Sequence, residues 1–355
     1  MHFDILNFMK YITFLLLPII LFSQELQTRS QVLMGTFVHI TLTSQHTPQT
    51  SQSFKLIKEI EHSLSSYAHK ALVYRLNHEH TVPYDSYLAE ALKLSKKYYQ
   101  DTHGYFDITI GSISKKLYHF GEENSSVPNK KALQQAKLNI EAIEINATTT
   151  TTEKDITIDL GGMGKGYALD KVADFLEEQN ITQGIVALSG DIRCLDVCSF
   201  ELQSPYSEQT FASLQSKIPQ LSISTSGTYR RYINAKENHH LINPKTAKQG
   251  KAFVSVSLFT HADNAKIDAY ATAISVMPEK VALAFLKEHD EIGYILVKSD
   301  GNVVYGNVEK FVSLRWLDYK EKATIPSNSK KSKTKSPRKS NLTHPDTTAP
   351  KMISK

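Results

Sequence analysis

Alternating apolar and polar positions mark the beginning of the structured part of the chain. Apolar or small side chains occupy every second position from 32 to 42: Val32, Met34, Thr36, Val38, Ile40 and Leu42. This period of two predicts a half-buried β-strand. Four further apolar residues then recur at intervals of three and four: Phe54, Ile57, Ile60 and Leu64. That spacing predicts an amphipathic helix with one face in the core.

Patterns of the same two kinds continue through the second half of the chain. Residues 156–159 and 185–188 read as buried strands, and residues 292–297 and 303–305 flank the turn dipeptide Asp300-Gly301 as a hairpin would. One helix carries its apolar face on Ala168, Leu169, Val172, Ala173 and Leu176. Because no regular strand–helix–strand repeat appears, we expect an α+β fold, one large domain of two closely joined lobes with mixed sheets and flanking helices.

The two ends of the chain differ from this body. Residues 11–22 form an apolar run behind Lys10 that ends at Ser23, which is the plan of a secretory signal peptide over residues 1–24. An uncleaved signal-anchor is the alternative, although a comfortable bilayer span needs about 20 residues. Either reading predicts export to the periplasm, in the second case with attachment to the inner membrane. Residues 320–355 are rich in Lys, Ser, Thr and Pro and predict a basic disordered tail, which leaves residues 25–319 as the domain.

The net charge of +5 belongs to that tail. Residues 320–355 contain ten Lys or Arg and two acids, whereas residues 1–319 contain 31 basic and 34 acidic residues. The body is therefore mildly acidic, and its charge gives no support to a nucleic-acid partner. Cys194 and Cys198 are too few for a disulfide framework, and two readings stay open: one local disulfide, or two buried thiols.

The segment from Asp159 to Asp170 is the most informative one for chemistry. An extended stretch ends in a carboxylate, glycines at 161, 162 and 164 expose the backbone, Lys165 follows, and a helix begins. Bare backbone at a helix N-terminus beside a lysine suits the close approach of a phosphate. The spacing matches neither a Walker loop nor the dinucleotide fingerprint G-x-G-x-x-G. A tight structural turn explains the glycines equally well.

Two further sets of residues are candidates for catalysis. Asp268 and Thr272 stand four residues apart on a predicted helix that ends before Pro278, so their oxygens share one face. Hard oxygen ligands favour Mg²⁺, and a buried Asp–Thr hydrogen bond is the alternative. His240 precedes an Asn-Pro turn and could act as a general base near neutral pH, or could be a structural histidine.

Taken in order, these segments resemble the FAD:protein FMN transferase family, the ApbE-type flavin transferases. The matching stretches are 34–36, 64–67, 104–107, 159–170, 189–193, 225–230, 240–244 and 268–272. The resemblance implies an α+β domain with a flavin cleft between its lobes. It also implies an enzyme that uses Mg²⁺ to activate FAD, moves FMN onto a Thr or Ser hydroxyl of an acceptor redox protein, and releases AMP.

The resemblance also assigns roles to single residues of this chain. It implies flavin-nucleotide contacts at Met34, Tyr67, Tyr105, Phe106, Asp107, Asp159, Lys165 and Ile242. It implies metal ligation by the Gly162 carbonyl and by the side chains of Asp268 and Thr272, and proton acceptance by His240. The chain departs from the family pattern at Ser189, Asn243 and Ala247, where Gly, Asp and Gly are common; these departures affect the cleft rather than the reaction.

Two other functions remain compatible with the same residues. A hydrolase would split FAD into FMN and AMP with water as the acceptor. A flavin-binding protein would hold FAD without any chemistry. AMP release in the absence of an acceptor distinguishes the first from a transferase, and loss of activity on changing Asp268 and His240 excludes the second.

Overall fold

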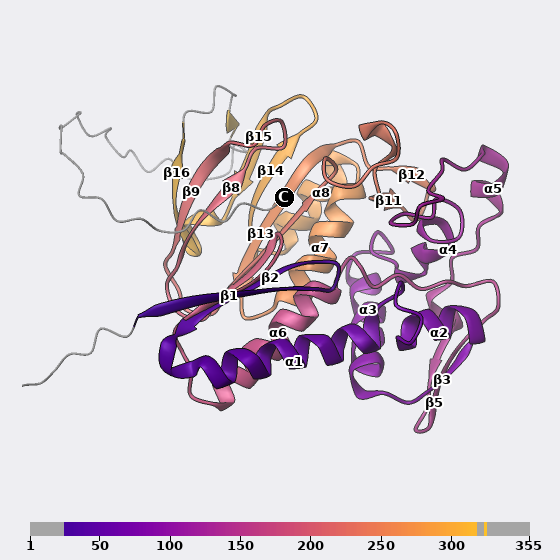
Figure 1. Ribbon diagram of the computed structural model, residues 1–355. Helices are drawn as coiled ribbons and strands as arrows, with labels where there is room; N and C mark the ends of the chain where they lie inside the picture. The colour runs from indigo at the N-terminus through magenta and orange to yellow at the C-terminus, as the bar shows by residue number, and fades with distance from the viewer. Residues whose placement is uncertain (1–24, 318–322, 325–355) are drawn as a thin grey trace, which may run out of the picture.

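A nine-stranded sheet forms the centre of the computed structural model, which describes residues 25–317 and 323–324 (Figure 1). Neighbouring strands are antiparallel except for the last pair. The order across the sheet is β1 (Leu26–Leu33), β2 (Thr36–Thr43), β6 (Ile185–Leu188), β7 (Asp191–Cys194), β10 (Leu221–Gly227), β13 (Phe253–His261), β14 (Gly293–Lys298), β15 (Val303–Gly306) and β17 (Ala323–Thr324).

Helices and three smaller sheets make up the rest of the regular structure in the described part of the chain. One three-stranded sheet consists of β16 (Val312–Trp316), β9 (Thr210–Ser216) and β8 (Ser199–Gln203), a second of β3 (Thr81–Pro83), β5 (Thr149–Thr152) and β4 (Ile143–Ile145), and β11 (Ile242–Asn243) pairs with β12 (Lys248–Gln249). The helices are α1 (Thr47–Leu64), α2 (Leu72–Glu79), α3 (Ser86–Asp101), α4 (Gly111–Ser114), α5 (Lys130–Gln135), α6 (Gly164–Glu178), α7 (Asn264–Val276) and α8 (Glu279–Glu288).

The two faces of the central sheet have different cores. Leu258 and Leu296 face the helical side, where α6 and α7 pack, and belong to a cluster that continues into α1, α2 and α3. Their neighbours Phe259 and Ile295 point the opposite way, into a cluster with the β8–β9–β16 sheet. In Figure 1 the helices α2 to α5 lie together at one end, with β3 and β5 beside α2, and the central sheet with β8, β9 and β16 lies at the other. The cluster on the helical side contains residues of both the central sheet and α1 to α3, so these parts share one core, and the predicted α+β fold as a single domain is confirmed.

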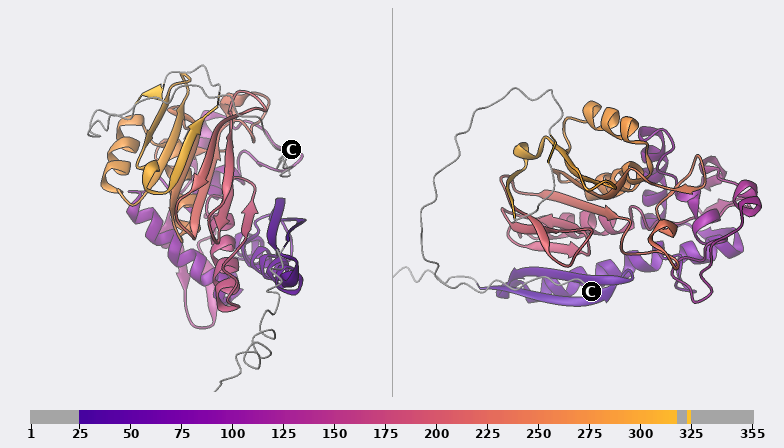
Figure 2. Two further views of the ribbon diagram at one scale, coloured as in Figure 1. Left: turned by 90° about the vertical axis from the view of Figure 1, so that its left-hand side faces the viewer. Right: turned by 90° about the horizontal axis from the view of Figure 1, so that it is seen from above.

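The strand predicted over residues 32–42 is wrong in one respect, because it is a hairpin. Met34 and Gly35 both have positive φ, 51° and 70°, as a two-residue turn between twisted strands requires. Leu33 therefore pairs with Thr36. Figure 2 shows this ribbon at the edge of the molecule beside α1. Val38 is buried, whereas Val32 is 66% exposed.

Residues 156–159 also differ from the prediction, since they are extended without belonging to any sheet. Asn77 replaces a neighbouring strand: its side-chain amide donates to the Ile158 carbonyl at 2.9 Å and accepts from the Ile158 N–H at 2.7 Å. The Asp159 N–H donates to the carbonyl of Ile108. The other predicted elements are confirmed: the helices α1, α6 and α7, the strand β6 and the β14–β15 hairpin.

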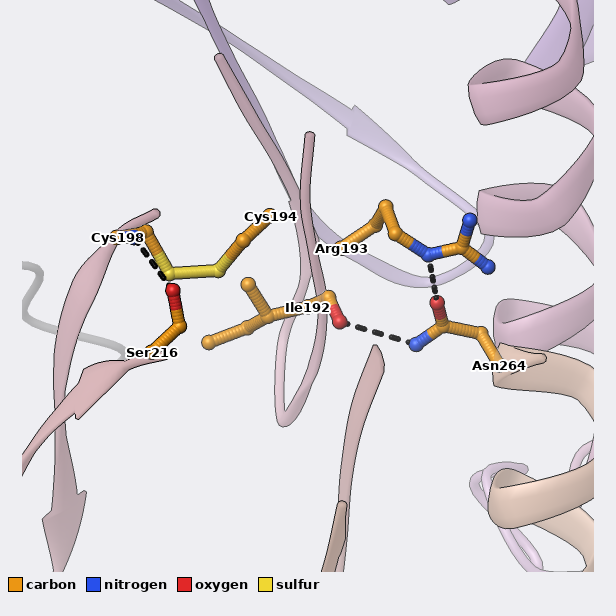
Figure 3. The surroundings of a disulfide bond; sticks show 6 residues. All are labelled: Ile192, Arg193, Cys194, Cys198, Ser216 and Asn264. Atoms are coloured by element: carbon orange, nitrogen blue, oxygen red, sulfur yellow. Dashed lines mark hydrogen bonds between the residues drawn. A yellow bond between two sulfur atoms is a disulfide. The ribbon is translucent and has the colours of Figure 1, made fainter. Parts of the chain in front are cut away.

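A disulfide joins Cys194, at the end of β7, to Cys198, before β8 (Figure 3). Of the two readings that the sequence left open, the structure has the disulfide. Beside it, the Asn264 amide donates to the Ile192 carbonyl at 3.0 Å and accepts from the Arg193 guanidinium at 2.8 Å. These bonds fix the first turn of α7 to β7, and so position the helix that carries Asp268.

The predictions for the chain ends fall largely outside the described residues. The signal segment 1–24 lies there entirely, as does most of the basic tail, of which Ala323–Thr324 form strand β17. Within the described part of the chain, no helix has both the length and the apolar character that a membrane crossing needs.

Candidate active site

The loop of residues 159–163 connects an extended segment to α6, and polar side chains gather on both of its sides. Lys165, in the first turn of α6, lies between two carboxylates. Its Nζ is 2.8 Å from Oδ2 of Asp191 and 3.3 Å from Oδ2 of Asp268. Asp191 and Asp268 are nearly inaccessible, at 1% and 2% exposure, whereas the Lys165 side chain is 27% exposed. Lys165 thus carries the charge that lets both carboxylates be buried.

The ionisation of this cluster depends on that arrangement. Burial raises the pKa of Asp268, and the neighbouring Asp191 carboxylate raises it further. Burial alone would lower the pKa of Lys165, but the two carboxylates outweigh it and hold the pKa above its ordinary value. Lys165 is therefore a permanent cation, and Asp268 is the carboxylate that a further positive charge would stabilise most.

Hard oxygen atoms collect next to Asp268. The Thr272 hydroxyl, one helical turn further along α7, donates to the Gly162 carbonyl at 3.3 Å. The Oδ2 atom of Asp268 accepts from the Gly166 N–H at 3.1 Å, while its Oδ1 atom accepts no hydrogen bond from any described residue. A side chain at Gly162 would meet Thr272 at 3.0 Å. The structure thus places Thr272 against Gly162, one helical turn from Asp268. Oxygen atoms of these kinds fit Mg²⁺, and the metal roles of the three residues stay predictions.

Carboxylates and histidines alone do not define a metal centre here. Among the residues that the structure describes, no three His, Cys, Asp or Glu side chains converge as a metal site. The expected Mg²⁺ ligands are one carboxylate, one hydroxyl and one carbonyl, so this finding does not test them. The Mg²⁺ site stays a prediction.

Asp159 organises the other side of the loop. Its Oδ1 accepts from the Gly161 N–H at 3.0 Å and its Oδ2 from the Ser114 hydroxyl at 2.9 Å. The ammonium of Lys115 lies 3.9 Å from Oδ2 and 3.2 Å from the centroid of the Tyr67 ring. Burial by itself would raise the pKa of Asp159, but Lys115 and these hydrogen bonds lower it overall, so the side chain is ionised at neutral pH.

His240 lies beside this cluster in the form that a general base requires. Its Nδ1 is 3.2 Å from the Arg231 carbonyl, which can only accept, so Nδ1 carries the proton and Nε2 carries the lone pair. The Arg231 guanidinium donates to the Tyr67 hydroxyl at 2.8 Å. Burial, and then the Arg231 charge, lower the pKa of His240 to about 4. The ring is therefore neutral at physiological pH and can accept a proton at Nε2.

The remaining residues of the expected flavin contacts divide into two groups. Phe106, Asp107 and Ile242 are 3%, 7% and 4% exposed. Their buried positions have structural explanations: Phe106 packs near Gly162, the Asp107 carboxylate accepts from the N–H and hydroxyl of Thr109 at 2.8 and 2.6 Å, and Ile242 belongs to a small apolar cluster. Burial raises the pKa of Asp107. These contacts stay predictions.

Met34 and Tyr105 are half-buried and closer to accessible surface. The backbone N–H of Met34 donates to a Glu61 carboxylate oxygen at 2.8 Å, which fixes the β1–β2 turn to α1. Its methyl group lies 3.7 Å from where a Cβ would stand on Gly164. The Lys245 ammonium lies 4.6 Å from the ring centroid of Tyr105. The turn and the start of α6 therefore meet at the edge of the site.

Sequence reasoning missed three charged residues of the site. Asp191 stands in the Ser-Gly-Asp turn after β6, where Ser189 has a φ of 58°, and that turn was the available signal. Arg231 follows Arg230 in a segment already singled out. Lys115 gave no signal, because the adjacent Lys116 looks the same in sequence but is exposed.

Comparison with known proteins gives concordant matches. The model of the ApbE family matches residues 34–296. A FAD:protein FMN transferase of Klebsiella pneumoniae is 24% identical over 292 residues, which cover 79% of this chain and 92% of the relative. One from Vibrio cholerae is 26% identical over 267 residues, with 69% and 78% coverage.

Solved structures match in fold. The crystal structure of the ApbE protein from Thermotoga maritima superposes with a TM-score of 0.72 at 22% identity, covering 81% of this chain and 98% of that one. The flavin transferase ApbE from Vibrio cholerae superposes with a TM-score of 0.66 at 23% identity, covering 83% and 98%. At this level of identity the two structures establish the fold.

Proposed function

The chain belongs to the ApbE family, and from this premise we propose that it transfers the FMN moiety of FAD to a threonine or serine hydroxyl of an acceptor protein, releasing AMP. The observation that carries the proposal is the hydrogen bond of His240 Nδ1 with the Arg231 carbonyl, which leaves Nε2 without a hydrogen bond from any described residue. The loop of residues 159–163, with Lys165 and the hard oxygens of Gly162 and Thr272, supplies the other groups that the reaction needs. The names of the curated relatives support the flavin chemistry.

The reaction exchanges one phosphorus–oxygen bond for another. The acceptor hydroxyl oxygen bonds to the phosphorus of the FMN half, and the bond from that phosphorus to the bridging oxygen breaks. AMP leaves with the electron pair, and the hydroxyl proton passes to Nε2 of His240. A threonine hydroxyl is a weak nucleophile without such a base, and a positioned base contributes roughly 10²–10⁴ in rate.

Charge neutralisation is the second requirement. The Gly162 carbonyl, Asp268 and Thr272 would hold Mg²⁺, and a bound Mg²⁺ neutralises the diphosphate oxygens on which charge develops. Lys165 supplies a further positive charge from the first turn of α6, where backbone N–H groups also favour an anion.

The proposed setting is the periplasm, with an acceptor redox protein at or near the inner membrane. The signal-like segment 1–24 motivates this setting. The Cys194–Cys198 disulfide supports it, because disulfides persist in oxidising compartments and are rare in the cytosol.

The test mixes the purified chain, FAD, Mg²⁺ and an acceptor fragment that contains a flavinylation threonine. We expect flavin fluorescence on the acceptor band of a denaturing gel and an equal amount of AMP. His240→Asn should abolish both, while His261→Asn, at the exposed end of β13, should leave both unchanged. AMP release that needs no acceptor would make the protein a pyrophosphatase, and FAD binding without AMP would leave only a flavin-binding protein.

A further inference from the structure

Lys165 makes two ion pairs of unequal length, and both converge on carboxylates that face the same ammonium. The ion pair with Asp191 is the shorter one, at 2.8 Å, and the ammonium also donates a longer hydrogen bond of 3.3 Å to Asp268. Asp191 is further fixed by the Ser224 hydroxyl, which donates to its other oxygen. Asp268 has no such second side-chain partner among the described residues.

The free oxygen of Asp268 is the second observation. The Asp268 side chain is 2% exposed as a whole, and its Oδ1 atom accepts no hydrogen bond from the described chain. The nearby Thr272 hydroxyl and Gly162 carbonyl are hard oxygens as well. A small cation can satisfy this set, and the ammonium of Lys165 reaches only one of its atoms.

We propose that the Lys165 ammonium pairs with both Asp268 and Asp191 in the metal-free protein and so acts as an internal counter-cation. When a divalent cation binds Asp268, the ammonium pairs with Asp191 alone, which makes Asp191 a positioning residue. The proposal rests on the proposed function for its metal. It assigns to Asp191 a role in metal affinity without metal contact. The lysine side chain is 27% exposed, so its end can move within the site.

Two substitutions should change the Mg²⁺ affinity in opposite directions. Lys165 and a divalent cation repel each other across Asp268, so removing the ammonium should favour the metal. Asp191 draws the ammonium away from Asp268, so removing its charge should leave Lys165 on Asp268 and disfavour the metal. Residues in one ion-pair network couple by energies that correspond to changes of roughly twofold to a hundredfold in a dissociation constant, and we expect about tenfold here.

The experiment measures Mg²⁺ affinity by titration calorimetry on the full chain without FAD, at mildly alkaline pH where the carboxylates are ionised. Lys165→Met should tighten Mg²⁺ binding about tenfold, and Asp191→Asn should weaken it about tenfold, in line with couplings of that size. Asp268→Asn should abolish binding. Lys171→Met is the matched control, since Lys171 is on the same helix but pairs with Glu90 outside the site; it should leave the affinity unchanged.

Several results of these measurements would overturn the proposal. Weaker binding in both Lys165→Met and Asp191→Asn, or no change in either, would overturn the proposal. Melting curves identify a variant that fails to fold. If Asp191→Asn does not fold, the direction of the change in Mg²⁺ affinity in Lys165→Met decides the proposal. Absence of Mg²⁺ binding in the wild-type chain would also overturn it, while flavin transfer, assayed separately, would still test the proposed function. Transfer without Mg²⁺ would instead refute the metal part of that function.

Discussion

Gly166→Ala tests whether the site depends on the close approach of α6 to α7. A Cβ on Gly166 would stand 2.3 Å from the Asn264 carbonyl oxygen, 2.6 Å from its carbon and 2.9 Å from the Ala265 nitrogen. All three atoms are backbone at the start of α7, and that turn is fixed by the side chain of Asp170, whose two oxygens accept from the Asn264 and Ala265 N–H groups at 2.8 Å. To accommodate the methyl group, α6 and α7 must therefore move apart as rigid helices.

The expected cost follows from that rigidity. Overpacking of a well-packed interior costs about 1–3 kcal/mol, and occasionally more; because no flexible side chain can yield here, we expect a loss of about 3 kcal/mol. Urea denaturation measures it. The Gly166 N–H also donates to Asp268 at 3.1 Å, so flavin transfer should fall as well.

Gly164→Ala is the matched control, two residues earlier in the same helix. Its Cβ would meet only the ends of Met34 and Leu64 side chains, at 3.7 and 3.9 Å, which is ordinary contact. Alanine is favoured over glycine in helices by about 1 kcal/mol at most, so this variant should be as stable as wild type or slightly more stable. Equal stability of the two variants, or a loss below about 1 kcal/mol in Gly166→Ala, would refute the packing argument.

Three further predictions concern titration and the disulfide. The His240 base must be neutral. At saturating Mg²⁺, which would keep Asp268 ionised, kcat/KM for flavin transfer should therefore stay level above the His240 pKa of about 4 and fall as the pH drops through it; an acid limb that persists in any residual activity of His240→Ala would assign it to another group. Because the folded-state pKa of Asp159 is lowered, its contribution to stability is present at neutral pH and is lost as the pH falls through that pKa. Asp159→Asn should therefore lower stability at pH 7 and flatten the acid loss in urea denaturation, and an unchanged profile would show that Lys115 does not stabilise the carboxylate. The Cys194→Ser/Cys198→Ser variant should lose about 2 kcal/mol, the entropy of closing so short a loop, and reductant should bring the wild-type protein to the same melting temperature; a larger effect of reductant on the variant than on wild type would contradict this.

Helix periodicity was readable from the sequence because α1 and α6 each bury one face in the core, and that burial selects apolar residues at every third or fourth position. The β1–β2 turn was not readable for the converse reason. A two-residue turn keeps the alternation in step, so apolar positions at 32, 36 and 38 look like one strand. Gly35 was the one ordinary turn residue there, since Met34 rarely adopts positive φ.

In the candidate site, contacts within one helix could be predicted from the sequence, whereas contacts between distant segments could not. Asp268 and Thr272 are four residues apart on one helix, so their proximity needed nothing beyond the helical repeat. The ion pair of Lys165 with Asp191 depends on how β7 packs against α6, and no local pattern contains that contact. Lys115 is buried and Lys116 is exposed because the chain turns after α4. Two adjacent lysines look alike in the sequence, so it could not predict which one is buried.

The charges of the assembled site predict that a divalent cation and a diphosphate substrate bind cooperatively. Lys165, Lys115 and Arg231 balance Asp159, Asp191 and Asp268, the six charged side chains found on the two sides of the loop. A diphosphate brings negative charge into surroundings where burial makes uncompensated charge costly, and a divalent cation restores the balance. Each should therefore strengthen the binding of the other by the same factor, because linkage between two ligands is reciprocal. Titrating FAD at low and at saturating Mg²⁺ measures that factor, and a factor of one would mean that the six side chains already accommodate the diphosphate without the metal.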